Sequence, residues 1–119
     1  MLVPASNWGM IQKTAASWAD AVCNDLEDAV TVDEKEASRA NVARAYKELD
    51  FGNKLRMYRI NGLDTHYAYR DIIDVVEAAG DCIDLIVVPK VNRPEDVYVV
   101  GNLADADRKL SKIYAAYRY

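Results

Sequence analysis

Charged side chains that could bind an anionic substrate follow three apolar segments of the sequence. Asp25, Glu27 and Asp28 come directly after one such segment, Arg59 lies at the end of the next, and Lys90 follows a third. Three carboxylates close to a guanidinium and an ammonium would suit Mg²⁺ together with an anionic substrate. The guanidinium offers a flat fork for a carboxylate, and the ammonium offers a point charge for a phosphate.

Each of these side chains also has a structural interpretation. The three carboxylates fit an ordinary solvated loop, and the lysine on its own fits a surface residue. Arg59 shares one strand face with Leu55 and Met57, which we predict to be the buried face. Because a buried arginine is rare unless it is paired, Arg59 fits a substrate-binding residue and a structural ion pair equally well.

Four short apolar runs alternate along the chain with four segments of helical periodicity. The strands are predicted at residues 2–3, 19–24, 55–60 and 83–88. The helices are predicted at 7–17, 33–49, 65–79 and 92–117, the last with a weak point at 101–102. Asn7, Asp33 and either Asp64 or Thr65 are the expected capping residues, and a stripe of Tyr69, Ile72, Ile73 and Val76 is the expected apolar face of the third helix.

Strands that are separated by crossover helices pair in parallel, and the crossovers are nearly always right-handed. The pattern therefore predicts a single α/β domain over residues 1–119, either a (β/α)4 half of a TIM (β/α)8 barrel or a small doubly wound sheet such as a flavodoxin-like binding domain. No glycine-rich phosphate loop follows any predicted strand, which disfavours a nucleotide site. In either fold the carboxyl ends of the strands gather the candidate residues at one edge.

Composition narrows the class of protein. The chain has 119 residues, with 15 Lys and Arg against 19 Asp and Glu and a formal charge of −4, so we expect no nucleic-acid binding. No apolar run is long enough for a membrane helix, and Met1 to Pro4 lack a signal-peptide pattern, so we predict a cytoplasmic protein without membrane contact. Cys23 and Cys82 are predicted to be buried, reduced thiols.

Several strings of the sequence resemble one enzyme family in register over residues 2–100. They are VPASN at 3–7, DLEDAV at 25–30, RINGLDT at 59–65 and VPKV at 88–91. The chain resembles the N-terminal half of the citrate lyase β-subunit and malyl-CoA lyase family, the HpcH/HpaI aldolase/citrate lyase family. The resemblance implies a (β/α)8 barrel enzyme that uses Mg²⁺ to cleave or form a carbon–carbon bond between an acyl-CoA and a keto acid.

The resemblance also implies roles for individual residues. Arg59 is expected to bind the keto-acid carboxylate or carbonyl, while Glu27 and Asp28 are expected to line the metal and substrate pocket. The residues expected at the substrate and CoA side are Lys13, Lys90 and Asn61. The direct Mg²⁺ ligands of the family, a Glu and an Asp, come from strands beyond the fourth.

The family expectation leaves two functional hypotheses. The first is a lyase for substrates such as citryl-CoA, malyl-CoA or citramalyl-CoA that is inactive without the strands that carry the metal ligands. The second is a non-catalytic half-barrel that acts through self-association or a partner chain, because a four-stranded half-barrel leaves two open sheet edges. The second hypothesis predicts self-association into a pseudo-barrel dimer, and we expect a homo-oligomer.

Overall fold

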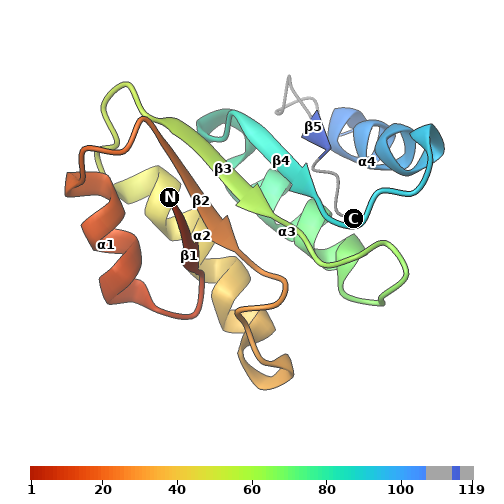
Figure 1. The fold of residues 1–119 in the computed structure, drawn as a ribbon, viewed down its shortest axis with the longest axis horizontal. Helices are drawn as coiled ribbons and strands as arrows, with labels where there is room; N and C mark the ends of the chain where they lie inside the picture. Colours follow the sequence, from red (N-terminus) through yellow and green to blue (C-terminus); the bar gives the residue numbers. More distant parts are fainter. Residues whose placement is uncertain (107–113, 116–119) are drawn as a thin grey trace.

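The computed structural model describes residues 1–106 and 114–115 of the chain (Figure 1). Strands and helices alternate, and two short 3₁₀ turns, at Val32–Glu34 and Gly80–Cys82, complete the helical structure. The elements are β1 (Leu2–Pro4), α1 (Trp8–Ala16), β2 (Ala21–Asp25), α2 (Lys35–Glu48), β3 (Leu55–Arg59), α3 (Ala68–Ala79), β4 (Leu85–Val88), α4 (Pro94–Ala106) and β5 (Tyr114–Ala115).

The strands form one parallel sheet in the order β1-β2-β3-β4-β5. A doubly wound sheet reverses its strand order at a switch point, whereas a barrel adds each strand beside the one before it. The sequential order confirms the predicted half-barrel and excludes the doubly wound alternative for this part of the chain. The register sets Asp25 of β2 beside Arg59 of β3, and Arg59 beside Val87 of β4.

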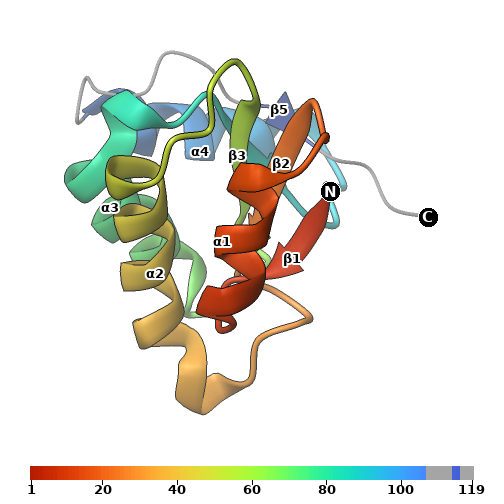
Figure 2. The same cartoon turned by 90° about the vertical axis from the view of Figure 1, so that its left-hand side faces the viewer.

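The helices cover one face of this sheet and leave the other open (Figure 2). Tyr58 and Ile60 point toward the helices and are fully buried, whereas Leu55 is 40% exposed on the opposite face. The prediction that Leu55, Met57 and Arg59 form the buried face is therefore wrong. Residues of this second face point into the interior of a complete barrel, and no strand stands opposite them among the described residues.

The C-terminal part differs from the prediction. Helix α4 runs through Gly101 without a break and ends at Ala106, and Tyr114–Ala115 forms strand β5 beside Val87 and Val88. The prediction of a helix to residue 117 is therefore wrong at residues 114–115. Residues 107–113 and 116–117 lie outside the described part of the chain. Unpaired backbone groups along β4 favour a further strand, and such tertiary pairing overrides a local helical pattern.

One of the predicted capping residues is confirmed. The Asn7 side chain accepts a hydrogen bond from the Met10 backbone N–H at 3.0 Å. Asp33 is not a capping residue, because it lies inside the 3₁₀ turn that precedes α2. Negative charge there still complements the positive end of the helix dipole.

Helix α3 has one apolar face, but its members differ partly from the predicted stripe. Ile72 and Val76 are buried as predicted, whereas Tyr69 is 55% exposed and Val75 is buried instead. Asp71 is also buried on this helix, and its partners belong to the candidate site. None of the helices in the described ranges has the length and hydropathy needed to cross a membrane.

Candidate functional site

A buried ion pair joins β2 and β3 at their carboxyl ends. Arg59 Nε donates to Asp25 Oδ1 at 2.8 Å, and Arg59 Nη2 donates to Asp25 Oδ2 at 2.7 Å. The Asp25 carboxylate also accepts from the backbone N–H groups of Glu27 and Ala29. This two-point contact fixes the plane of the guanidinium and orients it at the sheet edge.

Glu27 lies between two cations at the same edge. Its Oε1 is 3.5 Å from Arg59 Nε, and its Oε2 is 3.3 Å from Lys90 Nζ. The carboxylate is buried and has no hydrogen-bond partner in the described part of the chain, so these ion pairs hold it. Three side chains from three successive strand ends therefore meet at one charged mouth.

Two neighbouring pockets open beside this mouth and share Gly62, Asp64 and Lys90. The smaller has a volume of about 310 Å³ and the larger about 640 Å³. Asp28 is exposed and lines the smaller pocket, and its charge reinforces the positive charge of Arg59. The remaining residues that line the smaller pocket are Glu27, Val30, Lys35, Asn61, Thr65 and Tyr67.

The ion pair shifts the pKa values of both partners. Burial opposes ionisation of Asp25, but hydrogen bonds from Arg59, Glu27 and Ala29 outweigh it and lower the pKa of this carboxyl below 3.8. The hydrogen bond to Asp25 raises the pKa of Arg59 against the opposing effect of burial. Both groups are therefore charged throughout the neutral range.

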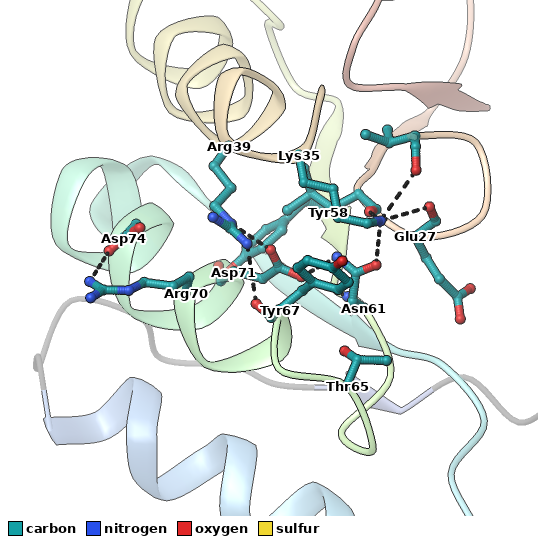
Figure 3. Close-up of polar contacts among 12 residues, drawn as sticks. Glu27, Lys35, Arg39, Tyr58, Asn61, Thr65, Tyr67, Arg70, Asp71 and Asp74 are labelled. Carbon is teal, nitrogen blue, oxygen red and sulfur yellow. Dashed lines mark hydrogen bonds and ion pairs between the residues drawn. The ribbon is translucent and has the colours of Figure 1, made fainter. Parts of the chain in front are cut away.

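A second polar network lies behind the mouth (Figure 3). Lys35 Nζ donates to Asn61 Oδ1 at 2.6 Å, and Asn61 Nδ2 donates to Asp71 Oδ2 at 2.6 Å. Arg39, one turn after Lys35 on α2, donates from Nε to Asp71 Oδ1 at 2.7 Å. Burial lowers the pKa of Lys35, and the nearby Asp71 charge opposes this shift.

The structure separates the six sequence-predicted site residues into three groups. It brings Glu27, Arg59 and Lys90 into contact, and it places Asp28 on the wall of the adjoining pocket. The Asn61 amide also lines that pocket, but both ends of it are engaged in the network with Lys35 and Asp71. Lys13 lies exposed on α1, and no described hydrogen bond or ion pair joins it to the mouth. The substrate and CoA roles of Lys13, Lys90 and Asn61 remain predictions.

The solvated-loop interpretation of the acidic segment is wrong for two of its three carboxylates. Asp25 and Glu27 are buried, and only Asp28 is exposed. Sequence reasoning missed Asp25 as the partner of Arg59, although a charged side chain at the end of an apolar strand was the available signal. It also missed Lys35, because a lysine among polar helical residues has no pattern that indicates burial.

The acidic residues present do not fit a magnesium site by themselves. Both Asp25 oxygens accept hydrogen bonds from Arg59, and both Glu27 oxygens face a cation. Within residues 1–106 and 114–115, no group of three or more acidic, His or Cys side chains is placed to hold a metal ion. Mg²⁺ needs several oxygen ligands that are not neutralised by cations.

The two cysteines do not take part in the charged mouth. Cys23 is buried on β2, and burial raises the pKa of its thiol to about 12. Cys82 is half-buried beside α3, and both thiols are free. A thiol with so high a pKa is a poor nucleophile, so Cys23 acts as a small apolar residue, as predicted.

The sheet order and the helices on one face define a parallel half-barrel, and comparison with known proteins identifies the family. The chain belongs to the HpcH/HpaI aldolase/citrate lyase family, whose model matches residues 1–112. The L-malyl-CoA/beta-methylmalyl-CoA lyase of Cereibacter sphaeroides is 48% identical over 103 residues, which are 87% of this chain and 32% of that relative.

Further relatives share the region. The malyl-CoA/beta-methylmalyl-CoA/citramalyl-CoA lyase of Chloroflexus aurantiacus is 38% identical over 82% of this chain and 29% of its own length. A (3S)-malyl-CoA thioesterase of Cereibacter sphaeroides is 38% identical over 87% of this chain and 35% of its own length. The crystal structure of RipC from Yersinia pestis superposes with a TM-score of 0.64 at 25% identity, covering 96% of this chain and 43% of RipC. The chain thus spans about a third of the length of these curated relatives.

Proposed function

We propose that this chain supplies the anion-binding half of the active site of a magnesium-dependent carbon–carbon lyase. The enzyme would cleave 3-hydroxyacyl-CoA thioesters of the malyl-CoA or citramalyl-CoA type into an acyl-CoA and a keto acid. Family membership and the malyl-CoA lyase relatives support the reaction class. The charged mouth at the carboxyl ends of β2, β3 and β4 supports the placement of the site.

The observation that carries this proposal is the orientation of Arg59. Two of its N–H groups donate to Asp25, and the hydrogen bonds of this side chain to the described residues end there. The guanidinium keeps further N–H groups for a second anion. A guanidinium fixed on one edge and open on the other suits the carboxylate of a keto acid, since little side-chain freedom is lost on binding.

The reaction defines what each side chain would do. Cleavage of malyl-CoA breaks the bond between the carbinol carbon and the carbon next to the thioester. The hydroxyl loses its proton and becomes the carbonyl of glyoxylate, and the electron pair passes to the enolate of acetyl-CoA, which is then protonated. Arg59 would bind the carboxylate that leaves in glyoxylate, with Glu27 and Asp28 along the pocket, and Lys90 would face the CoA side.

Magnesium would polarise the keto oxygen in such a lyase. The acidic residues described here are neutralised by cations, so we place the direct ligands outside these residues and derive no step through the metal. On this proposal the 119-residue chain binds the keto acid but turns over little substrate by itself.

Glyoxylate binding tests the role of Arg59. We expect weak, saturable binding of glyoxylate to the chain by isothermal titration calorimetry. Arg59→Gln should abolish the signal because the bidentate donor is lost, and Arg56→Gln on the same strand is the matched control that should leave it unchanged. Equal binding by the wild type and Arg59→Gln would contradict the proposed site.

Turnover tests the expectation of little activity. Incubation of the chain with malyl-CoA and Mg²⁺ should release little product. Acetyl-CoA and glyoxylate would indicate a lyase, whereas malate and free CoA would indicate a thioesterase. Turnover at the rate of a full-length lyase would show that the chain holds its own metal ligands, against the placement given above.

The open face of the sheet favours a second candidate, a non-catalytic half-barrel that self-associates. Leu2 is 53% exposed and Leu55 is 40% exposed on or beside this face, and β1 has an unpaired edge in the described sheet. The opposite edge is less open than predicted, because Val87 and Val88 of β4 already pair with β5.

Light scattering tests this second candidate. A dimer or larger species at tens of micromolar would support self-association, and Leu55→Lys should return the chain to a monomer, with Val32→Lys, an exposed residue outside the sheet, as the control. A strictly monomeric wild type at that concentration would contradict it.

A further inference from the structure

Lys35 lies beneath the segment that joins β2 to α2 and makes an unusual set of contacts. Its ammonium donates to the backbone carbonyls of Leu26 at 3.0 Å, Glu27 at 3.3 Å and Val30 at 3.2 Å. It also donates to the Asn61 side-chain oxygen at 2.6 Å, and the residue is 7% exposed. These contacts place four oxygen acceptors around one buried cation.

The acceptors come from the two segments that carry the charged mouth. Leu26, Glu27 and Val30 belong to the segment that holds the Glu27 carboxylate, and Asn61 lies two residues after Arg59. Figure 3 shows the Glu27 carbonyl oxygen directed toward the Lys35 ammonium and the Glu27 carboxylate directed away from it. One ammonium therefore connects the backbone behind Glu27 to the end of β3.

The far side of Asn61 is fixed as well. Asp71 Oδ2 accepts from both the Asn61 backbone N–H at 2.8 Å and its side-chain Nδ2 at 2.6 Å, and Arg39 holds the other Asp71 oxygen. The Tyr58 hydroxyl donates to the Asp71 backbone carbonyl at 2.9 Å. These partners determine that the oxygen end of the Asn61 amide faces Lys35. The network therefore has a single arrangement, which restricts the motion of the backbone beside the charged mouth.

Lys35 itself is unsuited to covalent chemistry. An ammonium has three protons and no lone pair, and here it faces four acceptors within hydrogen-bonding distance. A nucleophilic amine would have to lose a proton and with it one of these contacts. Charge–dipole contacts with the carbonyls offset the burial of the cation, so its role is to hold the backbone.

We propose that Lys35 is a positioning residue of the site. By binding the 26–30 backbone to Asn61, it keeps the Glu27 side chain between Arg59 and Lys90. The reaction that it would serve is the lyase reaction proposed above, and only the binding readout below depends on that proposal. Without the ammonium, three backbone carbonyls and one amide oxygen lose a charged donor, and the 26–30 segment is free to move away from β3.

Backbone hydrogen exchange followed by NMR tests the proposal without any ligand. In Lys35→Met, exchange should rise about ten-fold or more at the Ala29 and Val30 amides, which donate to the Asp25 carboxylate and the Glu27 carbonyl. The Asp84 amide, bonded to Arg56 at the other end of β3, should keep its rate. Lys47→Met, an exposed lysine of the same helix, is the matched control and should change neither.

Glyoxylate binding supplies the readout that a merely structural lysine would not change. The Kd should rise about ten-fold in Lys35→Met and stay unchanged in Lys47→Met, as for other residues that orient a binding group. If the wild type binds no glyoxylate, the proposed function fails, but the exchange result still decides the role of Lys35. Exchange that rises equally at Ala29 and Asp84, or at neither, would overturn the role.

A wild-type measurement covers the case in which Lys35→Met does not fold. The Lys35 ammonium should give a slowly exchanging ¹H–¹⁵N signal with couplings across its hydrogen bonds to the 26, 27 and 30 carbonyls. The Lys47 ammonium should exchange with water too fast to be seen under the same conditions. A Lys35 ammonium that exchanges as fast as that of Lys47 would overturn the proposal.

Discussion

Strand β3 carries two arginines that each face an aspartate of a neighbouring strand region, and they differ in their surroundings. Arg56 contacts Asp84 at 3.2 Å and 3.3 Å, and both side chains are 32% exposed. Arg59 contacts Asp25 at 2.8 Å and 2.7 Å, and the Asp25 side chain is 1% exposed. Arg59 also faces Glu27, which in turn faces Lys90.

The difference shows that two ion pairs on one strand can differ widely in burial and contact distance. Arg56 joins strands at the amino end of the sheet, where a solvated pair contributes little to stability. Arg59 lies at the carboxyl end of the sheet, which is where barrels carry their functional residues. Burial there strengthens the interaction between the charges. The shorter, drier contact fixes the Arg59 guanidinium, as the proposed binding of a second anion requires.

The largest expected effect is on stability. Asp25→Ala should lower the free energy of unfolding by about 3 kcal/mol, because it leaves a mostly buried guanidinium unpaired and two backbone N–H groups without their acceptor. Asp84→Ala should cost about 1 kcal/mol or less, since its pair is partly solvated. Urea unfolding measures both values, and equal losses would remove the distinction between the two pairs.

A pH series sharpens the same contrast. The folded pKa of Asp25 lies below its ordinary value of 3.8, so its contribution to stability is complete above pH 3.8 and is lost as the pH falls through the folded pKa. The stability difference between wild type and Asp25→Asn, measured by urea unfolding, should therefore shrink as the pH falls below about 3.8. A difference that stays constant down to pH 2 would contradict the lowered pKa.

The smallest expected effect comes from conservative substitution of the arginines. Arg59→Lys should destabilise the fold by about 1 kcal/mol, because an ammonium cannot make the two parallel hydrogen bonds to Asp25. Arg56→Lys should change stability by less than about 0.5 kcal/mol. Thermal unfolding of the two variants provides the measurement, and a larger loss for Arg56→Lys would reverse the assignment.

The positions of the first four strands along the chain were predictable from the sequence, because apolar runs and helical periodicity are local signals. It did not show which face of β3 is buried, since alternation at Tyr58 and Arg59 has the same period on both faces. The helices settle that question by packing on the Tyr58 side. Strand β5 was missed because its two residues gain their partners only from β4.

Part of the site was likewise predictable. Charged residues after apolar strands indicated the mouth, and the DLEDAV and RINGLDT strings indicated the family, which the family model confirms. The network behind the mouth was not predictable, because Lys35 and Asp71 come from helices whose sequence separation from Asn61 carries no pattern. Their roles depend on tertiary contacts that only the folded chain reveals.

The central claim is that Arg59, and not Arg56, receives a keto-acid carboxylate, and the side-chain Nε–H signals of the two arginines test it most directly. During a glyoxylate titration followed by ¹H–¹⁵N NMR, the Arg59 signal should shift saturably while the Arg56 signal stays in place. Parallel, unsaturable shifts of both signals, or a saturable shift of Arg56 alone, would contradict the account.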